Sequence, residues 1–404
     1  MFIMNARIDF INGNTKRCLM AMALPMIAAM FLNMMYNFVD SLWIGNLLGE
    51  TAYAALTNST PVILVLTSVA MGATNGVSIL ISRAVGAKDR KRTESLVVTS
   101  FCVAVVFAVL VTVLLEVFLP GILNALNTPA ETYEMAYSYL SIYVLGYLAV
   151  YLYLYFTAVL RSFGNSMFQA AAMLISTILN AILDPVFIHF IGFHGAAIAT
   201  LLSQMICLLF MLIYLKKKKL FAFKISVFDR HDVLTFIQKA VPSVIQQSIP
   251  AISTTFLTAL VSTYSVTAIA AYGVTGKLET ILFYPAMALN MVLTTIIGQC
   301  VGGARYDRAK DYLKCALGYG CGLLVLLSVL VVGFSKQLSG LFVKSSDVAV
   351  IVGTYFLIVS IGYVLNTVTN CYLGMLNGMG KPSKSMLLMV FYYIVVRMPL
   401  AYLL

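Results

Sequence analysis

Long apolar runs, separated by short polar turns, follow one another from about residue 18 to the end of the chain. A helix that crosses a membrane needs roughly 20 apolar residues, because it must span the hydrocarbon layer and satisfy its backbone internally. Hydropathy and the Gly, Pro and polar breakers divide the chain into about eleven such segments. They are residues 18–46, 53–82, 95–119, 133–160, 168–190, 194–215, 236–262, 267–298, 310–334, 348–376 and 385–404. The pattern therefore predicts an all-α polytopic membrane protein.

The composition agrees with a chain that is embedded in a membrane over its whole length. Of its 404 residues, 61% are hydrophobic and 10% are charged, and the mean hydropathy is +0.95. A soluble domain has about 45–50% apolar and about 25% charged residues, so that class is excluded. The first apolar run, CLMAMALPMIAAMFLNMMYNFV, is too long for the core of a cleavable signal peptide.

The positive charges are distributed very unevenly among the loops. Of the 26 Lys and Arg residues, 22 fall at the N-terminus and in alternate loops, whereas the opposite loops hold only Lys336 and Lys344. The remaining two, Lys277 and Arg397, fall within spans. The positive-inside rule then predicts a cytoplasmic N-terminus. We expect the chain to lie in the cytoplasmic (inner) membrane of a bacterium. The net charge of +11 is interpreted as a topology signal, aided by anionic membrane lipid, and not as a nucleic-acid surface.

The chain aligns with itself at one constant shift. AVGAKDRKR, from residue 84, meets CVGGARYDR, from residue 300, and LRSFGN at 160–165 meets LNGMGK at 376–381. The same shift across five spans indicates a duplication. We predict an N-lobe of residues 1–215, a cytoplasmic linker of residues 216–235 and a C-lobe of residues 236–404. A six-span repeat preserves orientation, so the lobes should be related by an axis along the membrane normal.

The second copy is one span shorter than the first. The N-lobe has a sixth span, GAAIATLLSQMICLLFMLIYL, whose partner should begin near residue 411, but the sequence ends at Leu404. Either the protein has eleven spans, or the twelfth helix of a two-times-six plan is missing from this sequence. We favour the second explanation, because a lobe of five spans would leave exposed the surface on which its sixth helix should pack.

Two carboxylates lie inside apolar spans of the N-lobe at similar depth. Asp40 precedes the outer end of the first span by about seven residues, and Asp184 precedes the outer end of the fifth by about six. Asn180 lies one helical turn before Asp184, and Thr200 enters the sixth span from the same side. Two carboxylates with amide and hydroxyl oxygens suit a hard cation such as Na⁺, and two acids held together in a low dielectric equally suit a proton. The residues alone do not separate these two ions.

Simpler structural roles compete with an ion site. Asp40 precedes Trp43 and could anchor its helix among lipid headgroups, and Asp184 precedes Pro185 and could satisfy backbone groups freed by a kink. Lys277 and Glu279 form a candidate secondary charged site, although residues two apart do not face each other on a helix.

The sequence resembles the multidrug and toxic compound extrusion (MATE) family over essentially its whole length. The resemblance rests on LPMIAAMFLNMMYNFVDSLWIGNLLG, GVSILISRAVGAKDRKR, AVLRSFGNSMFQAAAMLISTILNAILDPVFI, GAAIATLLSQ and GVTGKLETILFYPAMALNMVLTTIIGQCVGGARYDRA. It implies twelve helices in two six-helix lobes, and antiport of amphipathic organic cations, including drugs, against H⁺ or Na⁺.

Within that family the chain is similar to the DinF-like branch, which couples transport through an acid-lined site in the N-lobe. The resemblance assigns that site to Asp40, Asn180, Asp184 and Thr200, with Na⁺ held by the first three if Na⁺ is the coupling ion. It also implies that Asn33, Tyr36, Met173 and Thr177 line the N-lobe chamber.

Two other functions are alternatives to this one. A lipid or lipid-linked saccharide flippase of the same superfamily would share the two-lobe plan, but it should have a more cationic cavity. An intramembrane enzyme would need a nucleophile, base or metal cluster, and no HExxH, P-loop or CxxC pair occurs among the scattered Cys and His. We therefore expect a monomeric transporter that is not an enzyme and needs no cofactor beyond its coupling ion.

Overall fold

The computed structural model describes residues 8–126, 128–218, 220–221, 227–261, 263–340 and 346–403. Lys344 and part of the predicted linker lie outside them. The described residues form helices and turns, with no strand among them. The helices are α1 (Thr15–Leu48), α2 (Glu50–Gly86), α3 (Arg90–Ala125), α4 (Ala130–Leu145), α5 (Tyr147–Ser162), α6 (Ser166–Ile191), α7 (Phe193–Lys218), α8 (Arg230–Val261), α9 (Val266–Gly302), α10 (Tyr306–Gly333), α11 (Ser335–Gly340), α12 (Ser346–Gly378), α13 (Pro382–Val390), the π-helix η3 (Phe391–Arg397) and α14 (Met398–Leu403). The all-α prediction is confirmed.

Ten helices in the described part of the chain are long and apolar enough to cross a membrane, and a bent pair brings the number to eleven. The bent pair is α4 and α5, which meet at 50° and together occupy the segment predicted as one span, 133–160. The bend falls at Gly146, where an added Cβ would collide with the side chain of Leu201 on α7. The close approach of α7 thus favours a glycine at the position of the bend. The last predicted span is a continuous run of α13, η3 and α14.

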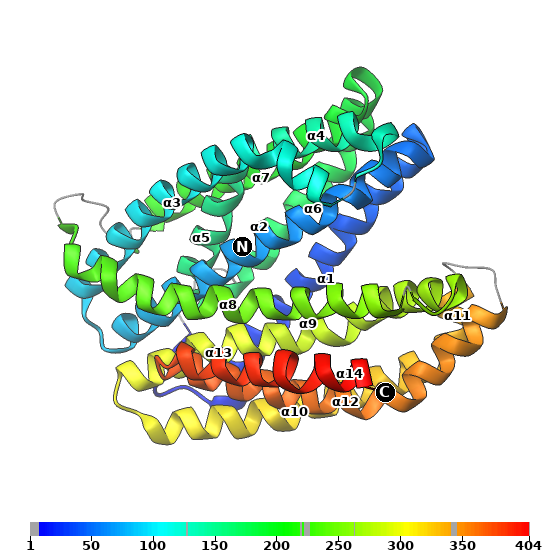
Figure 1. Ribbon diagram of the computed structural model, residues 1–404. Coiled ribbons are helices and arrows are strands. Elements are labelled where there is room, and N and C mark those ends of the chain that lie inside the picture. Colours follow the sequence, from blue (N-terminus) through cyan, green and yellow to red (C-terminus); the bar gives the residue numbers. More distant parts are fainter. Residues whose placement is uncertain are drawn as a thin grey trace.

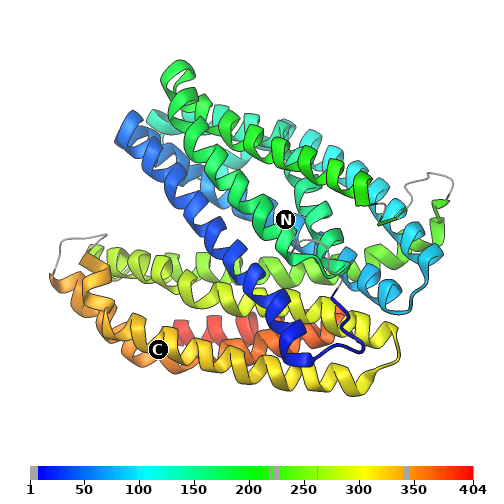
Figure 2. The same cartoon turned by 180° about the vertical axis from the view of Figure 1, so that it is seen from behind.

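The helices gather into two bundles, α1–α7 and α8–α14, whose long axes diverge (Figure 1). They come together at the end of the molecule that holds the α2–α3 and α9–α10 turns, and both views show this arrangement (Figures 1 and 2). We call it the basic end, because Lys88, Arg90, Lys91, Arg92, Arg305 and Arg308 lie there.

The bundles are joined through small residues on α2. A Cβ added at Gly76 would lie 2.8 Å from the Cα of Ala240 on α8, and one added at Gly72 would meet the backbone of Val244. Small residues let helix backbones approach closely, which gives dispersion contacts where lipid offers no hydrophobic driving force. Near the basic end, α2 crosses α9 in the same manner, since an added Cβ at Gly298 would collide with Ser82.

The backbone repeats at the offset found in the sequence. Lys88 (φ 56°) and Ala304 (φ 58°) are the two described non-glycine residues with positive φ, and they occupy equivalent positions of the repeat. Gly164 (φ 83°) and Gly380 (φ 74°) form a second equivalent pair at the same offset. A non-glycine residue rarely adopts positive φ, so its recurrence at equivalent turns shows that the two copies share local structure as well as sequence.

Candidate functional site

Three helices of the N-lobe bring the predicted ion-site residues together. Asp40 comes from α1, Asn180 and Asp184 come from one face of α6, and Thr200 comes from α7. All four are buried; Asn180 and Asp184 have no exposed surface, and Asp40 retains 8%. A headgroup anchor would be exposed, so the burial of Asp40 argues against that alternative.

Hydrogen bonds from Asn180 organise the site. Its Nδ2 donates to Asp184 Oδ1 at 2.9 Å and to Thr200 Oγ1 at 3.5 Å. The carboxyl group of Asp184 also faces that of Asp40 at hydrogen-bonding range. An asparagine one turn before the carboxylate therefore fixes one of its oxygens, Oδ1, by a hydrogen bond.

Three buried oxygens at this point receive no hydrogen bond from the residues that the structure describes. They are Asp40 Oδ1, Asp184 Oδ2 and Asn180 Oδ1. A buried acceptor without a donor is costly, and an uncompensated buried carboxylate is more so. The four ion pairs seen among the described residues do not involve Asp40 or Asp184. The arrangement fits a bound proton or a small hard cation, which would supply the missing positive partner.

A resident metal cluster is not part of this arrangement. Within the described ranges no three His, Cys, Asp or Glu side chains are placed to hold a metal ion together. A cation here would depend on two carboxylates with amide and hydroxyl oxygens, a set that suits Na⁺ better than a transition metal.

The residues that the resemblance assigned to the chamber lie on α1 and α6 near this site, but they differ in environment. Tyr36 is buried, and its hydroxyl lies 3.3 Å from Ser203 Oγ and 3.5 Å from the carbonyl oxygen of Thr200. Thr177 Oγ1 donates to the carbonyl of Met173 at 2.8 Å. Asn33 is exposed, and Met173 and Thr177 are half-buried. Tyr36 thus belongs to the polar core of the site, whereas the other three lie at its margin.

Sequence reasoning missed two members of the site. Tyr139, on α4, is buried and lies within electrostatic range of both Asp40 and Asp184. Its position in a tyrosine-rich span gave no distinguishing signal. Ser203 is also buried and lies three residues after Thr200, on the same helix face. That spacing could have identified it.

Glu279 occupies a separate place in the C-lobe. Its Oε1 accepts hydrogen bonds from Tyr363 at 2.7 Å and from Tyr355 at 2.8 Å, both on α12. Lys277 is exposed. The structure therefore pairs Glu279 with two tyrosines of α12. Lys277 and Glu279 lie two residues apart and do not share a helix face.

A polytopic, two-lobed helical protein with an acid-lined polar site inside one lobe belongs to the class of secondary membrane transporters. The family model MatE matches the chain twice, over residues 25–186 and 242–403. The chain therefore belongs to the MATE family of multidrug efflux transporters, and it is not an enzyme. The starting points of the two matched stretches, residues 25 and 242, agree with the offset of the internal repeat to within one residue.

Relatives from bacteria agree with this family. The probable multidrug resistance protein YpnP of Bacillus subtilis is 27% identical over 89% of this chain and 83% of its own length. The FAD transporter of Shewanella oneidensis is 25% identical over 98% of this chain and 90% of its own length.

Solved structures match the fold closely. One, described as the outward-facing conformation of a multidrug resistance MATE family transporter, has a TM-score of 0.93 at 22% identity and covers 99% of this chain and 90% of its own. A transporter from Pyrococcus furiosus has a TM-score of 0.92 at 23% identity, with the same coverage. The two-lobe, twelve-helix plan predicted from the sequence is consistent with both. The DinF-like assignment stays a prediction.

Proposed function

We propose that the chain is an antiporter that exports amphipathic organic cations in exchange for H⁺ or Na⁺, coupled through Asp40, Asn180, Asp184 and Thr200. One observation carries this proposal: Asp40 and Asp184 face each other inside the bundle, and neither has a positively charged partner among the described residues. Two adjacent negative charges in a low dielectric repel, so the site is stable only when a proton or a cation occupies it.

Occupancy of the site would bias the packing of α1 against α6 and α7. In the neutralised state, α1 stays in place through the contact of Tyr36 with Ser203 and of Asp40 with Asp184. When the ion leaves, repulsion between the two carboxylates disfavours this packing, and the equilibrium between lobe arrangements shifts. The ion enters from the side of the membrane opposite the basic end. Its entry and the release of a bound organic cation are then linked through one helix, α1.

The proposed setting is the cytoplasmic membrane of a bacterium, with the basic end in the cytoplasm and a single chain as the working unit. The positive-inside rule supports the orientation, and anionic lipids of the inner leaflet would contact the basic turns. Exposed Leu, Phe and Val side chains along α3 and α10 provide surface for lipid contact.

Efflux of a fluorescent cation such as ethidium tests the proposal. The natural chain is compared with Asp40→Asn and Asp184→Asn at matched expression, and Asp347→Asn, an exposed carboxylate at the start of α12, serves as the control. We expect both site variants to lose active efflux, because an amide removes the charge that the ion must neutralise, while the control retains it. Efflux by both site variants at the natural rate would refute the N-lobe coupling site.

The driving gradient identifies the ion and the substrate class. Proteoliposomes are energised by ΔpH or by ΔNa⁺ in turn, and the gradient that drives uptake in the natural chain but not in Asp184→Asn is the coupling one. FAD and a fluorescent phospholipid are included as cargoes, since one relative is an FAD transporter and the flippase alternative requires lipid movement. Transport of either one without organic cations would replace the drug-efflux proposal.

A further inference from the structure

Two arginines at equivalent positions of the repeat each reach from one lobe to the other. Arg92 and Arg308 are related by the offset of the repeat, and each is the third residue of its helix, α3 or α10. Each follows one of the two left-handed turn residues, Lys88 or Ala304. The same backbone turn thus delivers an arginine at the basic end of both lobes.

Arg92 contacts the beginning of α8, the first helix of the C-lobe. Its Nη2 lies 2.6 Å from Asp232 Oδ1, and Ser95 Oγ donates to Asp232 Oδ2 at 2.8 Å. The Asp232 side chain has no exposed surface. Next to it, the backbone N–H of Asp229 donates to Thr99 Oγ1 at 3.1 Å. A carboxylate from one lobe is therefore fully buried against an arginine and two hydroxyl-bearing residues of the other.

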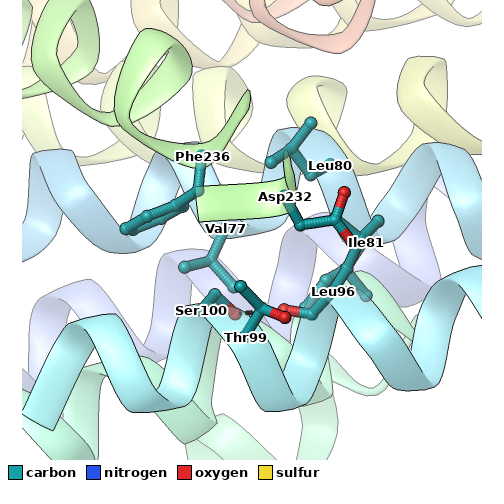
Figure 3. Close-up of a pocket in the computed structure, with 8 residues that line it drawn as sticks. All are labelled: Val77, Leu80, Ile81, Leu96, Thr99, Ser100, Asp232 and Phe236. Carbon is teal, nitrogen blue, oxygen red and sulfur yellow. Dashed lines mark hydrogen bonds between the residues drawn. The ribbon is translucent and has the colours of Figure 1, made fainter. Parts of the chain in front are cut away.

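Mostly apolar side chains lie around the Asp232 carboxylate (Figure 3). Asp232 and Phe236 of α8 lie against Val77, Leu80 and Ile81 of α2, and against Leu96, Thr99 and Ser100 of α3. The space among these eight side chains does not admit a water molecule. The Asp232 side chain is buried, whereas that of Arg92 is 40% exposed. Loss of the arginine contact would leave a buried carboxylate without its positive partner, which is unfavourable, so separating α8 from α2 and α3 costs free energy.

Arg308 makes the corresponding contact with the beginning of α1, the first helix of the N-lobe. Its Nη1 donates to Thr15 Oγ1 at 2.8 Å, and its Nη2 donates to the carbonyl oxygens of Gly13 and Phe10. The guanidinium also lies 5.2 Å from the centre of the Tyr312 ring, at cation–π distance. Arg308 thus holds the turn that leads into α1.

Asp9 shapes the turn that Arg308 holds. The backbone N–H groups of Asn12 and Ile11 both donate to its Oδ1 at 3.0 Å. The Asn12 N–H, with further hydrogen bonds of the same turn, holds the pKa of Asp9 below its usual value. The carbonyl acceptors of Phe10 and Gly13 are therefore presented by an ordered segment.

We propose that Arg92 and Arg308 form a pair of interlobe clamps that hold the basic end closed, and that both must release before that end can open. Each clamp joins the third helix of one lobe to the start of the first helix of the other, so a relative rotation of the lobes strains both together. The clamps differ in chemistry, because Arg92 binds a carboxylate whereas Arg308 binds a hydroxyl and backbone carbonyls. The inference does not depend on which ion drives transport.

Cysteine labelling tests the clamps. In a background without the seven native Cys, a single Ser243→Cys probe lies on α8 facing α2, at a position with no exposed surface. Inside-out membrane vesicles are treated with a membrane-impermeant maleimide, without drug or ion gradient, so the readout is separate from coupled transport. We expect Arg92→Gln and Arg308→Gln each to raise the labelling rate by about tenfold or more, since each removes interlobe bonds that resist opening.

Matched arginines in the same two turns provide the controls. Arg90 pairs with Glu94 at 2.9 Å and Arg305 pairs with Asp307 at 2.9 Å, both within their own lobe. Arg90→Gln and Arg305→Gln should therefore leave the labelling rate unchanged. A rise of equal size in these controls would overturn the proposal, because it would trace the effect to lost surface charge.

A charge exchange separates the ion pair from general disruption. Asp232→Asn should label as fast as Arg92→Gln, because the two variants break the same contact from its two sides. The double variant Arg92→Asp with Asp232→Arg should return labelling toward the natural rate. If Arg92→Gln, Asp232→Asn and Arg308→Gln all label at the natural rate in correctly inserted protein, the clamps do not hold the basic end closed.

Discussion

Asn180 satisfies one oxygen of Asp184, while the other oxygen is buried and receives no hydrogen bond from the described residues. Its own Oδ1 is buried and receives no hydrogen bond from the described residues, so in the proposed mechanism this oxygen is an acceptor for the coupling ion. The hydrogen bond from Asn180 is therefore the contact that orients the Asp184 carboxylate. Asn180 is therefore the residue whose removal should disturb ion binding most directly, apart from the acids themselves.

We predict that Asn180→Ala lowers both efflux and stability. The variant leaves Asp184 Oδ1 without its donor, and an unsatisfied buried acceptor costs about 1–3 kcal/mol. Thermal unfolding of detergent-purified protein and ethidium efflux from cells measure the two effects. Asn37→Ala is the control for stability, because the exposed Asn37 amide donates to a carbonyl on its own helix. A melting temperature for Asn180→Ala equal to that of Asn37→Ala would contradict the prediction.

At the scale of the element, α2 is the helix on which the two lobes meet. Gly72 and Gly76 let α8 approach its backbone, and Gly86 lies against Gln299 of α9. The equivalent contact of the second repeat places Gly302 of α9 against Arg83 of α2. The same contact, a glycine of one lobe against the backbone of the other, thus occurs in both repeats. The short distance between the helices depends on these glycines, because they have no Cβ.

Alanine substitutions of two helical glycines should have opposite effects. Gly76→Ala forces a Cβ to within 2.8 Å of the Cα of Ala240, so the helices must separate and stability falls. Gly121→Ala, on α3, meets nothing within 4 Å in the described part of the chain and should raise stability by about 0.5–1 kcal/mol through the lower entropy of its unfolded chain. Unfolding temperatures in one detergent compare the two, and an equal shift in both would show that α2 and α8 are not closely packed in solution.

At the scale of the whole molecule, the two lobes have similar backbones but different polar side chains in their interiors. The N-lobe holds the paired acids, whereas the C-lobe holds Glu279 bound by Tyr355 and Tyr363. Both lobes contribute an arginine to the basic end, and that end carries most of the positive charge of the described loops. In the proposed mechanism, this unequal chemistry makes the N-lobe the one that responds to the coupling ion, while both lobes contribute equivalent arginines to the basic end.

The orientation of the molecule can be tested with two exposed positions at opposite ends. Lys88→Cys, in the α2–α3 turn, should react with an impermeant maleimide only in inside-out vesicles, because the positive-inside rule places that turn in the cytoplasm. Tyr264→Cys, beside the start of α9 and 71% exposed, should react in intact cells. The reverse pattern would place the N-terminus outside.

The sequence by itself determined the helical class, about eleven spans and the two-fold repeat, because lipid cannot hydrogen-bond the backbone and so forces each apolar run into a helix. It also placed Asp40, Asp184 and Thr200 at one depth, since depth follows from the count of residues along each span. Only the tertiary structure decided which side chains meet there, because rotation about each helix axis and the choice of neighbours come from packing. Tyr139 of α4 lies within electrostatic range of the two acids, and Arg92 pairs with Asp232, which lies in the other half of the chain; neither contact has a signature in the order of residues.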